Sequence, residues 1–127
     1  MTHQFRQHYS REEARGLLPQ IREWLQRLQE LRPKLAQQDQ QIGQLLKGGN
    51  DLGGGLINNW VRLLAQTKAV VEEFRKREIQ LKDLDRGLID FPAIIGGREV
   101  FLCWEQDEDD IEFWHELDTG YAGRERL

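Results

Sequence analysis

The sequence predicts an α+β fold in which a long kinked antiparallel helical hairpin packs on a small antiparallel β-meander of three or four strands. Apolar residues recur at helical spacing over residues 10–46 and 56–78, and a glycine-rich segment separates these stretches. From residue 79 to 118 the period changes to the alternation of short strands between turn residues. At 127 residues the chain is most simply one domain, and residues 119–127 are expected to form an irregular tail.

The first helix is expected to begin at Ser10, because Ser10 and Glu13 have the spacing of a capping box. Apolar residues then follow at steps of seven: Ala14, Ile21, Leu28, Leu35 and Ile42. This is a seam of the coiled-coil type. Pro19 and Pro33 interrupt the helix, and each is expected to bend it. Because the seam stays in phase across both prolines, we expect one kinked helix rather than two helices.

Residues 47–55, KGGNDLGGG, are expected to form a flexible loop between the two helices. A phosphate-binding loop is the alternative, but such a loop follows a strand and ends in Lys with Ser or Thr at the start of a helix. Here a helix precedes the glycines, which favours a simple helical hairpin.

Four short segments of the second half have the pattern of strands, at residues 79–81, 88–91, 99–104 and 111–116. Gly96-Gly97 is a hairpin turn signal between two of them. Strand alternation places Cys103 and Phe101 on one face of the middle strand and Trp104 on the other. Both faces carry apolar groups, so either both faces are covered or one is an interaction surface.

Charge and composition exclude several function classes. The net charge is −4 and the acidic excess lies in the second half, so we expect no nucleic-acid binding. No apolar run of about 18 residues is present, so we expect no membrane span. The first ten residues lack the apolar core of a secretory signal, and a single cysteine, Cys103, is typical of a reducing compartment. We therefore expect a cytoplasmic protein. Residues 1–9 are expected to be an irregular terminus in which His3 and His8 do not contribute to a site.

The nearest approach to a chemical site is one imidazole among several carboxylates. The candidate residues are Asp83, Asp85, Asp90, His115, Glu116 and Arg124. Imidazole and carboxylate groups together can hold zinc, iron or manganese, and a His beside an acid can act as a general base. We therefore consider a divalent metal ion held by His115, Glu116 and Asp90. The alternative is structural: a hydrogen-bonded His at a strand end, and an ion pair between Asp90 and an arginine such as Arg124.

Three other features have both a functional and a structural interpretation. Cys103 can be a nucleophile beside His115, but a free cysteine more often packs as a small hydrophobic residue. Trp104, Trp114 and Tyr121 can stack on a ligand or belong to the core. The acidic run at residues 107–110 lacks the glycine and terminal Glu of a calcium loop, which favours a solvated turn.

Several motifs resemble one known family. They are Ser10-x-x-Glu13-Ala14 with Leu17-Leu18-Pro19, LKDLDRGLIDFPA at 81–93, VFLCWE at 100–105 and WHELDTGYAGR at 114–124. Together they resemble a bacterial and archaeal family catalogued as domain of unknown function number 2203. The resemblance implies a small cytoplasmic protein and supplies no activity, cofactor or catalytic residue.

Two functions of different class follow from the sequence. The first is a non-catalytic interaction module that forms a homo-oligomer through the helix seam. The second is a metal-binding protein or small metal-dependent enzyme centred on His115 with nearby carboxylates. A third option is a small ligand bound between the hairpin and the sheet, near Trp104 and Arg124.

Overall fold

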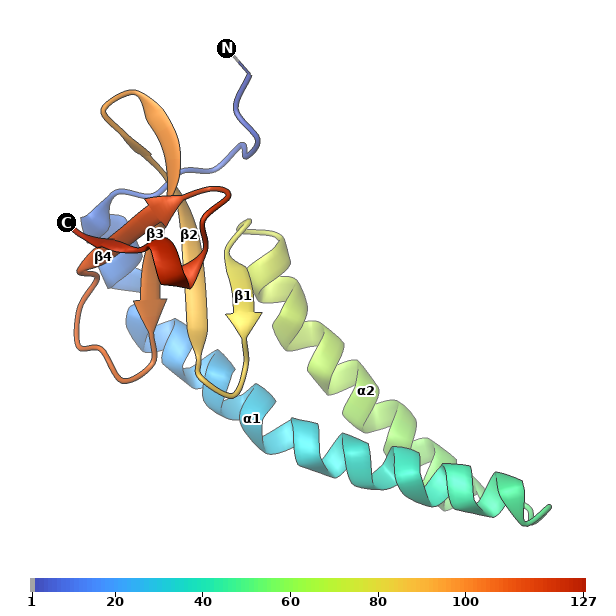
Figure 1. The fold of residues 1–127 in the computed structure, drawn as a ribbon. Coiled ribbons are helices and arrows are strands. Elements are labelled where there is room, and N and C mark those ends of the chain that lie inside the picture. The colour runs from blue at the N-terminus through green and yellow to red at the C-terminus, as the bar shows by residue number, and fades with distance from the viewer. Residues whose placement is uncertain (1) are drawn as a thin grey trace.

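The computed structural model describes residues 2–127, in which a helical hairpin lies against one face of a five-stranded sheet (Figure 1). The helices are α1 (Arg11–Lys47) and α2 (Gly54–Arg75), and the strands are β1 (Gln80–Asp83), β2 (Leu88–Ile95), β3 (Arg98–Glu105), β4 (Phe113–Glu116) and β5 (Glu125–Arg126). Neighbouring strands are antiparallel and follow chain order. The predicted α+β class is confirmed. Neither helix is long and apolar enough to cross a membrane.

Helix α1 begins where the capping box predicts. The Ser10 side chain accepts a hydrogen bond from the Glu13 amide at 3.1 Å, and the Ser10 amide donates to the Glu13 carboxylate at 3.0 Å. The helix then continues through Pro19 and Pro33 as a single element. Its buried side chains recur at helical spacing and include Ile21 and Leu25, both fully buried.

Helix α2 starts and ends slightly earlier than residues 56–78. It ends at Arg75 because the next residues form a turn in which the Glu78 amide donates to the Arg75 carbonyl at 3.0 Å. Glu78 adopts a positive φ of 58°, which turns the chain out of the helix and into β1. The two helices converge at their distal tip, beyond the end of the sheet (Figure 1).

The β2–β3 hairpin forms the centre of the sheet. Gly96 and Gly97 have φ values of 59° and 77°, as a tight two-residue hairpin turn requires. From this turn the pairing runs without a break and places Asp90 opposite Cys103. On the other edge of β3, Phe101 lies opposite His115 of β4.

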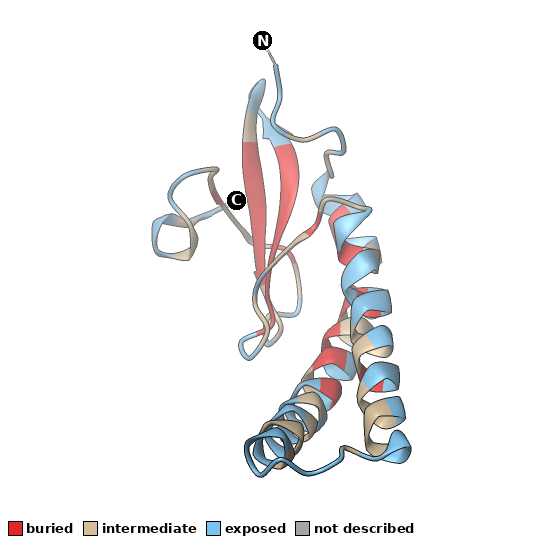
Figure 2. Cartoon of the chain, turned by 90° about the vertical axis from the view of Figure 1, so that its right-hand side faces the viewer, coloured by how far each residue is buried: buried red, intermediate tan, exposed pale blue. Residues whose placement is uncertain are grey.

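The two faces of the sheet have different covers. The helix-facing side carries the main apolar core, to which the sheet contributes Ile89, Phe91, Ala93, Val100, Leu102 and Trp104. Figure 2 shows β2 and β3 as almost continuously buried, while the outer sides of the helices are exposed. The opposite face carries Asp90, Phe101 and Cys103, which are also buried. Both faces are therefore covered, which was one of the two predicted alternatives.

The C-terminal segment is more ordered than the predicted irregular tail. Its short helix η1 (Tyr121–Gly123) is followed by β5, which pairs Arg126 with Phe113 and Glu125 with Trp114. This fifth strand was missed because two residues are too short to show an alternating pattern. Strand β4 in turn begins at Phe113 rather than at residue 111.

The N-terminal segment has irregular backbone, as predicted, but residues 2–9 are attached to the sheet; residue 1 lies outside the described range. Four backbone amides donate to two carboxylates: Gln4 and Phe5 to Glu99, and Arg6 and Gln7 to Glu78. The Tyr9 amide donates to the Pro92 carbonyl at 2.8 Å, on β2. These contacts join residues far apart in the chain, which explains why local sequence pattern did not reveal them.

The contact between α1 and the sheet predicts a large loss of stability on truncating Leu25. Leu25 is 0% exposed in the core, so Leu25→Ala is expected to lower the free energy of unfolding by about 2–5 kcal/mol. The neighbouring exposed variant Gln26→Ala is the matched control and should change it by under about 0.5 kcal/mol. Urea unfolding measures both values, and equal stability of the two variants would contradict this packing.

Candidate functional site

Three side chains with metal-ligating atoms meet on the sheet face opposite the helices. Asp90 on β2, Cys103 on β3 and His115 on β4 are 2%, 0% and 2% exposed. Asp90 and Cys103 are directly opposite each other, and His115 lies two positions along β4 from the partner of Cys103. Their ligand atoms lie within 4.8 Å of one another. We call these residues the Asp90–Cys103–His115 cluster.

Hydrogen bonds fix the orientation of the His115 ring. Nδ1 lies 2.6 Å from the backbone carbonyl of Glu116, and Nε2 lies 3.0 Å from Oδ2 of Asp90. A carbonyl oxygen only accepts, so Nδ1 carries a proton. Nε2 and Oδ2 then share one further proton, in either an imidazolium–carboxylate pair or a neutral pair.

Asp90 is the least satisfied member of the cluster. Within residues 2–127, its Oδ1 atom is buried without a hydrogen-bond partner, apart from the weak donor Cys103 nearby. Burial raises the pKa of Asp90, against the opposing effects of His115, Cys103 and Lys82. The folded chain therefore binds this proton more tightly than the unfolded chain. The stability that this proton contributes is lost as the pH rises through the folded-state pKa.

Cys103 is a thiol rather than a thiolate in the metal-free chain. Burial and then the Asp90 carboxylate raise its pKa to about 12, while the neighbouring Arg124 guanidinium acts in the opposite direction. A nucleophilic cysteine needs a lowered pKa and some exposure. The surroundings of Cys103 therefore favour a buried thiol or a metal ligand over a free nucleophile.

Arg124 closes the cluster from the C-terminal segment. Its guanidinium lies 3.9 Å from the Phe113 ring centroid and 4.2 Å from that of Tyr121. It also forms an ion pair with Glu108 at 3.0 Å. The arginine thus holds η1 against the sheet next to Cys103.

A cavity of about 200 Å³ opens beside the cluster. Its lining combines apolar and polar side chains: Lys82, Leu88, Asp90, Phe101, His115, Leu117, Gly120 and Tyr121. Asp90 and His115 therefore border a space large enough for water molecules or a small ligand.

The remaining predicted site residues lie elsewhere. The Glu116 carboxylate pairs with Arg98, so only its backbone carbonyl contacts the cluster. The Asp83 carboxylate accepts from the Arg86 amide at 3.2 Å and caps the β1–β2 turn. Asp85 pairs on the surface with Arg32 of α1 at 3.0 Å. Turn geometry and helix contacts, rather than sequence proximity to His115, decide where these side chains point.

The structure also bears on the ligand expected near Trp104 and Arg124 and on the acidic run at residues 107–110. Trp104 belongs to the helix-side core, whereas Arg124 covers the opposite face, so these two residues cannot enclose one ligand between hairpin and sheet. In the acidic run, Asp110 pairs with Arg15 at 2.8 Å.

Two groupings of side chains in the structure go beyond what the local sequence pattern indicates. The sequence predicts Cys103 as a core residue or a nucleophile, whereas the register that follows from the Gly96-Gly97 turn pairs it with Asp90. The irregular N-terminus is expected to contribute no site residue, yet His3 and His8 lie close to Glu99. No local pattern in the sequence indicates this second group.

A family model described as Uncharacterized conserved protein (DUF2203) matches residues 7–127. The chain therefore belongs to this family, in agreement with the resemblance of its motifs. No match was found among the curated proteins or among the solved structures.

The surroundings of Cys103 predict slow alkylation of the folded, metal-free chain. With a pKa of about 12, its thiolate fraction at pH 8 is roughly a thousandfold below that of an ordinary cysteine. Iodoacetamide labelling in the presence of a chelator should therefore be at least about a thousandfold slower than for the same chain in denaturant. Comparable rates in both states would contradict the buried thiol.

Proposed function

We propose that this member of the DUF2203 family is a metal-binding protein with Asp90, Cys103 and His115 as ligands of a zinc-class divalent ion. The convergence of these three buried side chains carries the proposal. Carboxylate, thiolate and imidazole are all common zinc ligands. Within residues 2–127, Oδ1 of Asp90 is buried without a strong hydrogen-bond partner. A metal ion would supply the missing partner, whereas a purely structural role leaves it unexplained.

The separation of the donor atoms is close to what zinc needs. Zinc bonds of about 2.0–2.3 Å place tetrahedral ligand atoms about 3.5 Å apart. The three donor atoms lie within 4.8 Å of one another, so shifts on the order of 1 Å complete the site. The ion would displace the proton between Nε2 of His115 and Asp90, and the proton on Cys103.

The hydrogen bond at the other nitrogen of His115 supports this role. A metal-bound histidine usually donates its second ring N–H to a carbonyl or carboxylate, which fixes the tautomer. In this chain Nδ1 donates to the Glu116 carbonyl at 2.6 Å. Nε2 is therefore the nitrogen available to a metal, and it points toward Asp90.

The cavity beside Asp90 and His115 is suited to a fourth, exchangeable ligand. Three protein ligands with one open position are typical of catalytic zinc sites, whereas structural sites have four protein ligands. A metal ion supplies Lewis acidity and lowers the pKa of a bound water. Lys82 and Tyr121 line the same cavity and can donate hydrogen bonds to a small anionic or oxygen-rich ligand there. We place the protein in a reducing compartment such as the cytoplasm, because an oxidised Cys103 could not ligate the ion.

The first test of the metal site is zinc binding by tag-free protein. With zinc at about 100 times its dissociation constant, the free energy of unfolding should rise by about 2.7 kcal/mol, which a thermal melt detects. Cobalt(II) in place of zinc should give a thiolate-to-metal charge-transfer band in the near ultraviolet. Cys103→Ser should remove this band, and His115→Gln should weaken binding at least about tenfold.

Asp85→Asn is the matched control, because this carboxylate pairs with Arg32 on the surface and lies outside the cluster. It should keep the band and the stabilisation. Native protein that shows neither stabilisation by zinc nor a cobalt–thiolate band would refute the metal proposal. Far-ultraviolet circular dichroism establishes that each variant is folded.

A second candidate function is self-association through the distal half of the helical hairpin. The proximal part of the seam, including Ala14 and Ile21, is already used in the chain's own core. Leu35 and Ile42 remain only partly buried. Leu35 also lines a groove of about 270 Å³ whose lining is mainly apolar: Leu28, Arg32, Leu35, Ala36, Asp39, Thr67, Val71, Leu81 and Leu84.

Exposed apolar residues on the distal hairpin favour a second copy of the chain as the partner. Leu46 and Val61 are 61% and 50% exposed. The seam has coiled-coil spacing, and this part of the hairpin projects beyond the sheet (Figure 1). The sheet therefore leaves this part of the hairpin open to a second copy.

Self-association predicts a dimer or larger assembly by light scattering at micromolar concentration. The double variant Leu46→Glu and Val61→Glu should shift the molar mass to that of the monomer, because charged side chains at an apolar interface are costly. Leu127→Glu is the control, since Leu127 is also exposed but lies at the sheet end. A monomeric native chain would contradict this second function.

A further inference from the structure

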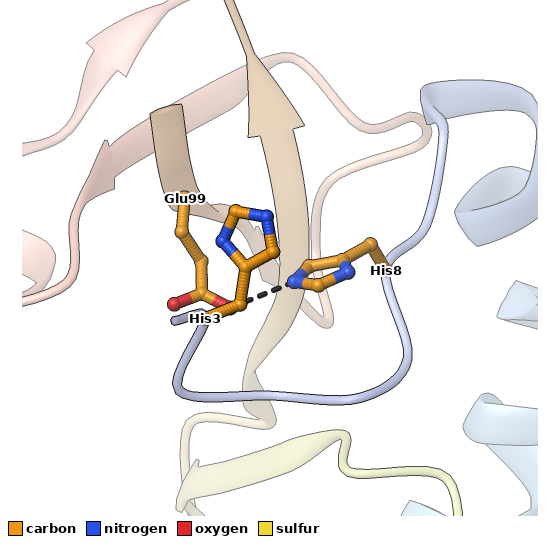
Figure 3. A group of neighbouring side chains, drawn as sticks. All are labelled: His3, His8 and Glu99. Atoms are coloured by element: carbon orange, nitrogen blue, oxygen red, sulfur yellow. Dashed lines mark hydrogen bonds and ion pairs between the residues drawn. The ribbon is translucent and has the colours of Figure 1, made fainter. Parts of the chain in front are cut away.

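A second group of metal-ligating side chains lies at the N-terminal segment. His3 and His8 flank the loop that approaches Glu99 of β3 (Figure 3). The ligand atoms of these three residues lie within 4.8 Å of one another. Nε2 of His8 is 2.7 Å from Oε2 of Glu99. The two imidazole rings meet edge to face with centroids 5.1 Å apart. We call these residues the His3–His8–Glu99 cluster.

The Glu99 carboxylate is held in place as a ligand would be. Its side chain is only 9% exposed. The Gln4 amide donates to Oε1 at 2.7 Å, and the Phe5 amide donates to Oε2 at 3.0 Å. The same loop that carries both histidines therefore orients the carboxylate, in the way that outer hydrogen bonds orient metal ligands.

Packing also fixes the loop that carries the histidines. Phe5, between them, contacts the Phe101 ring with centroids 5.4 Å apart. Tyr9, just after His8, donates through its hydroxyl to the Arg77 carbonyl at 2.7 Å. The positions of His3 and His8 beside Glu99 are thus set from both sides of the loop.

We propose that His3, His8 and Glu99 bind a second divalent transition-metal ion, of the zinc class. Two imidazoles and one carboxylate suit zinc, iron, nickel or copper, whereas calcium and magnesium prefer oxygen ligands throughout. The ion replaces the proton between His8 and Glu99. His3 is exposed and His8 partly so, which leaves the remaining coordination positions to water or an external ligand. This site does not depend on the Asp90–Cys103–His115 cluster.

His3 distinguishes a metal site from a simple ion pair. A protonated His8 paired with Glu99 accounts for the 2.7 Å contact without any role for His3. A metal ion requires the third ligand. Substitution of His3 is also structurally mild, because the side chain is exposed.

The experiment is titration of zinc into the tag-free chain of 127 residues, followed by calorimetry and by metal analysis after dialysis. We expect about two ions per native chain, one at each cluster. His3→Gln should weaken the N-terminal site at least about tenfold and leave the cobalt–thiolate band of the other cluster unchanged. Glu99→Gln should have the same effect, whereas Gln4→Ala, which keeps the backbone amide, should bind like the native chain.

Two results would overturn the proposal. One is a native chain that binds no ion beyond the one associated with the cobalt–thiolate band. The other is a His3→Gln variant with native affinity and stoichiometry. If binding without a thiolate band persists in Cys103→Ser and disappears in His3→Gln, the N-terminal site stands even where the proposed function fails.

Discussion

The two-residue turn at Gly96 and Gly97 determines which side chains meet on each face of the sheet. Both residues have positive φ, which a tight turn of this type requires and which glycine adopts without strain. The turn places Asp90 opposite Cys103. A slip of one residue would move Asp90 to the helix side and Phe91 away from it. One turn therefore sets both the sheet's contribution to the apolar core and the pairing of Asp90 with Cys103.

The two covers of the sheet explain why the polar cluster lies where it does. The helices bury an apolar layer, in which an unpaired carboxylate would be costly. The opposite face is covered by the short C-terminal segment, whose Arg124 stacks on Phe113 and Tyr121. That cover leaves a cavity bordered by Asp90 and His115. Within residues 2–127, Oδ1 of Asp90 is buried here without a hydrogen-bond partner, and a bound ligand would supply one.

The sequence predicted the elements better than the site. Helical periodicity and the Ser10–Glu13 capping box depend on residues a few positions apart, so α1 could be located closely. The pairing of Asp90 with Cys103 could also be counted from the glycine turn. The position of His115 could not be predicted in this way, because an irregular loop after β3 sets the β3–β4 register. Asp85 pairs with Arg32 of α1, and no local spacing in the sequence encodes that long-range contact.

The N-terminal segment shows how strongly the candidate site depends on contacts of long sequence separation. Glu99, Phe101 and Cys103 alternate along β3 and therefore share one face. The Phe101 ring contacts both Phe5 and His115, with centroid distances of 5.4 Å and 5.5 Å. The amide contacts that hold the N-terminal loop on Glu99 thus also hold Phe5 on Phe101, and Phe101 on His115. Because packed interiors leave few voids, the orientation of the His115 imidazole is supported by a segment whose composition alone suggested no structural role.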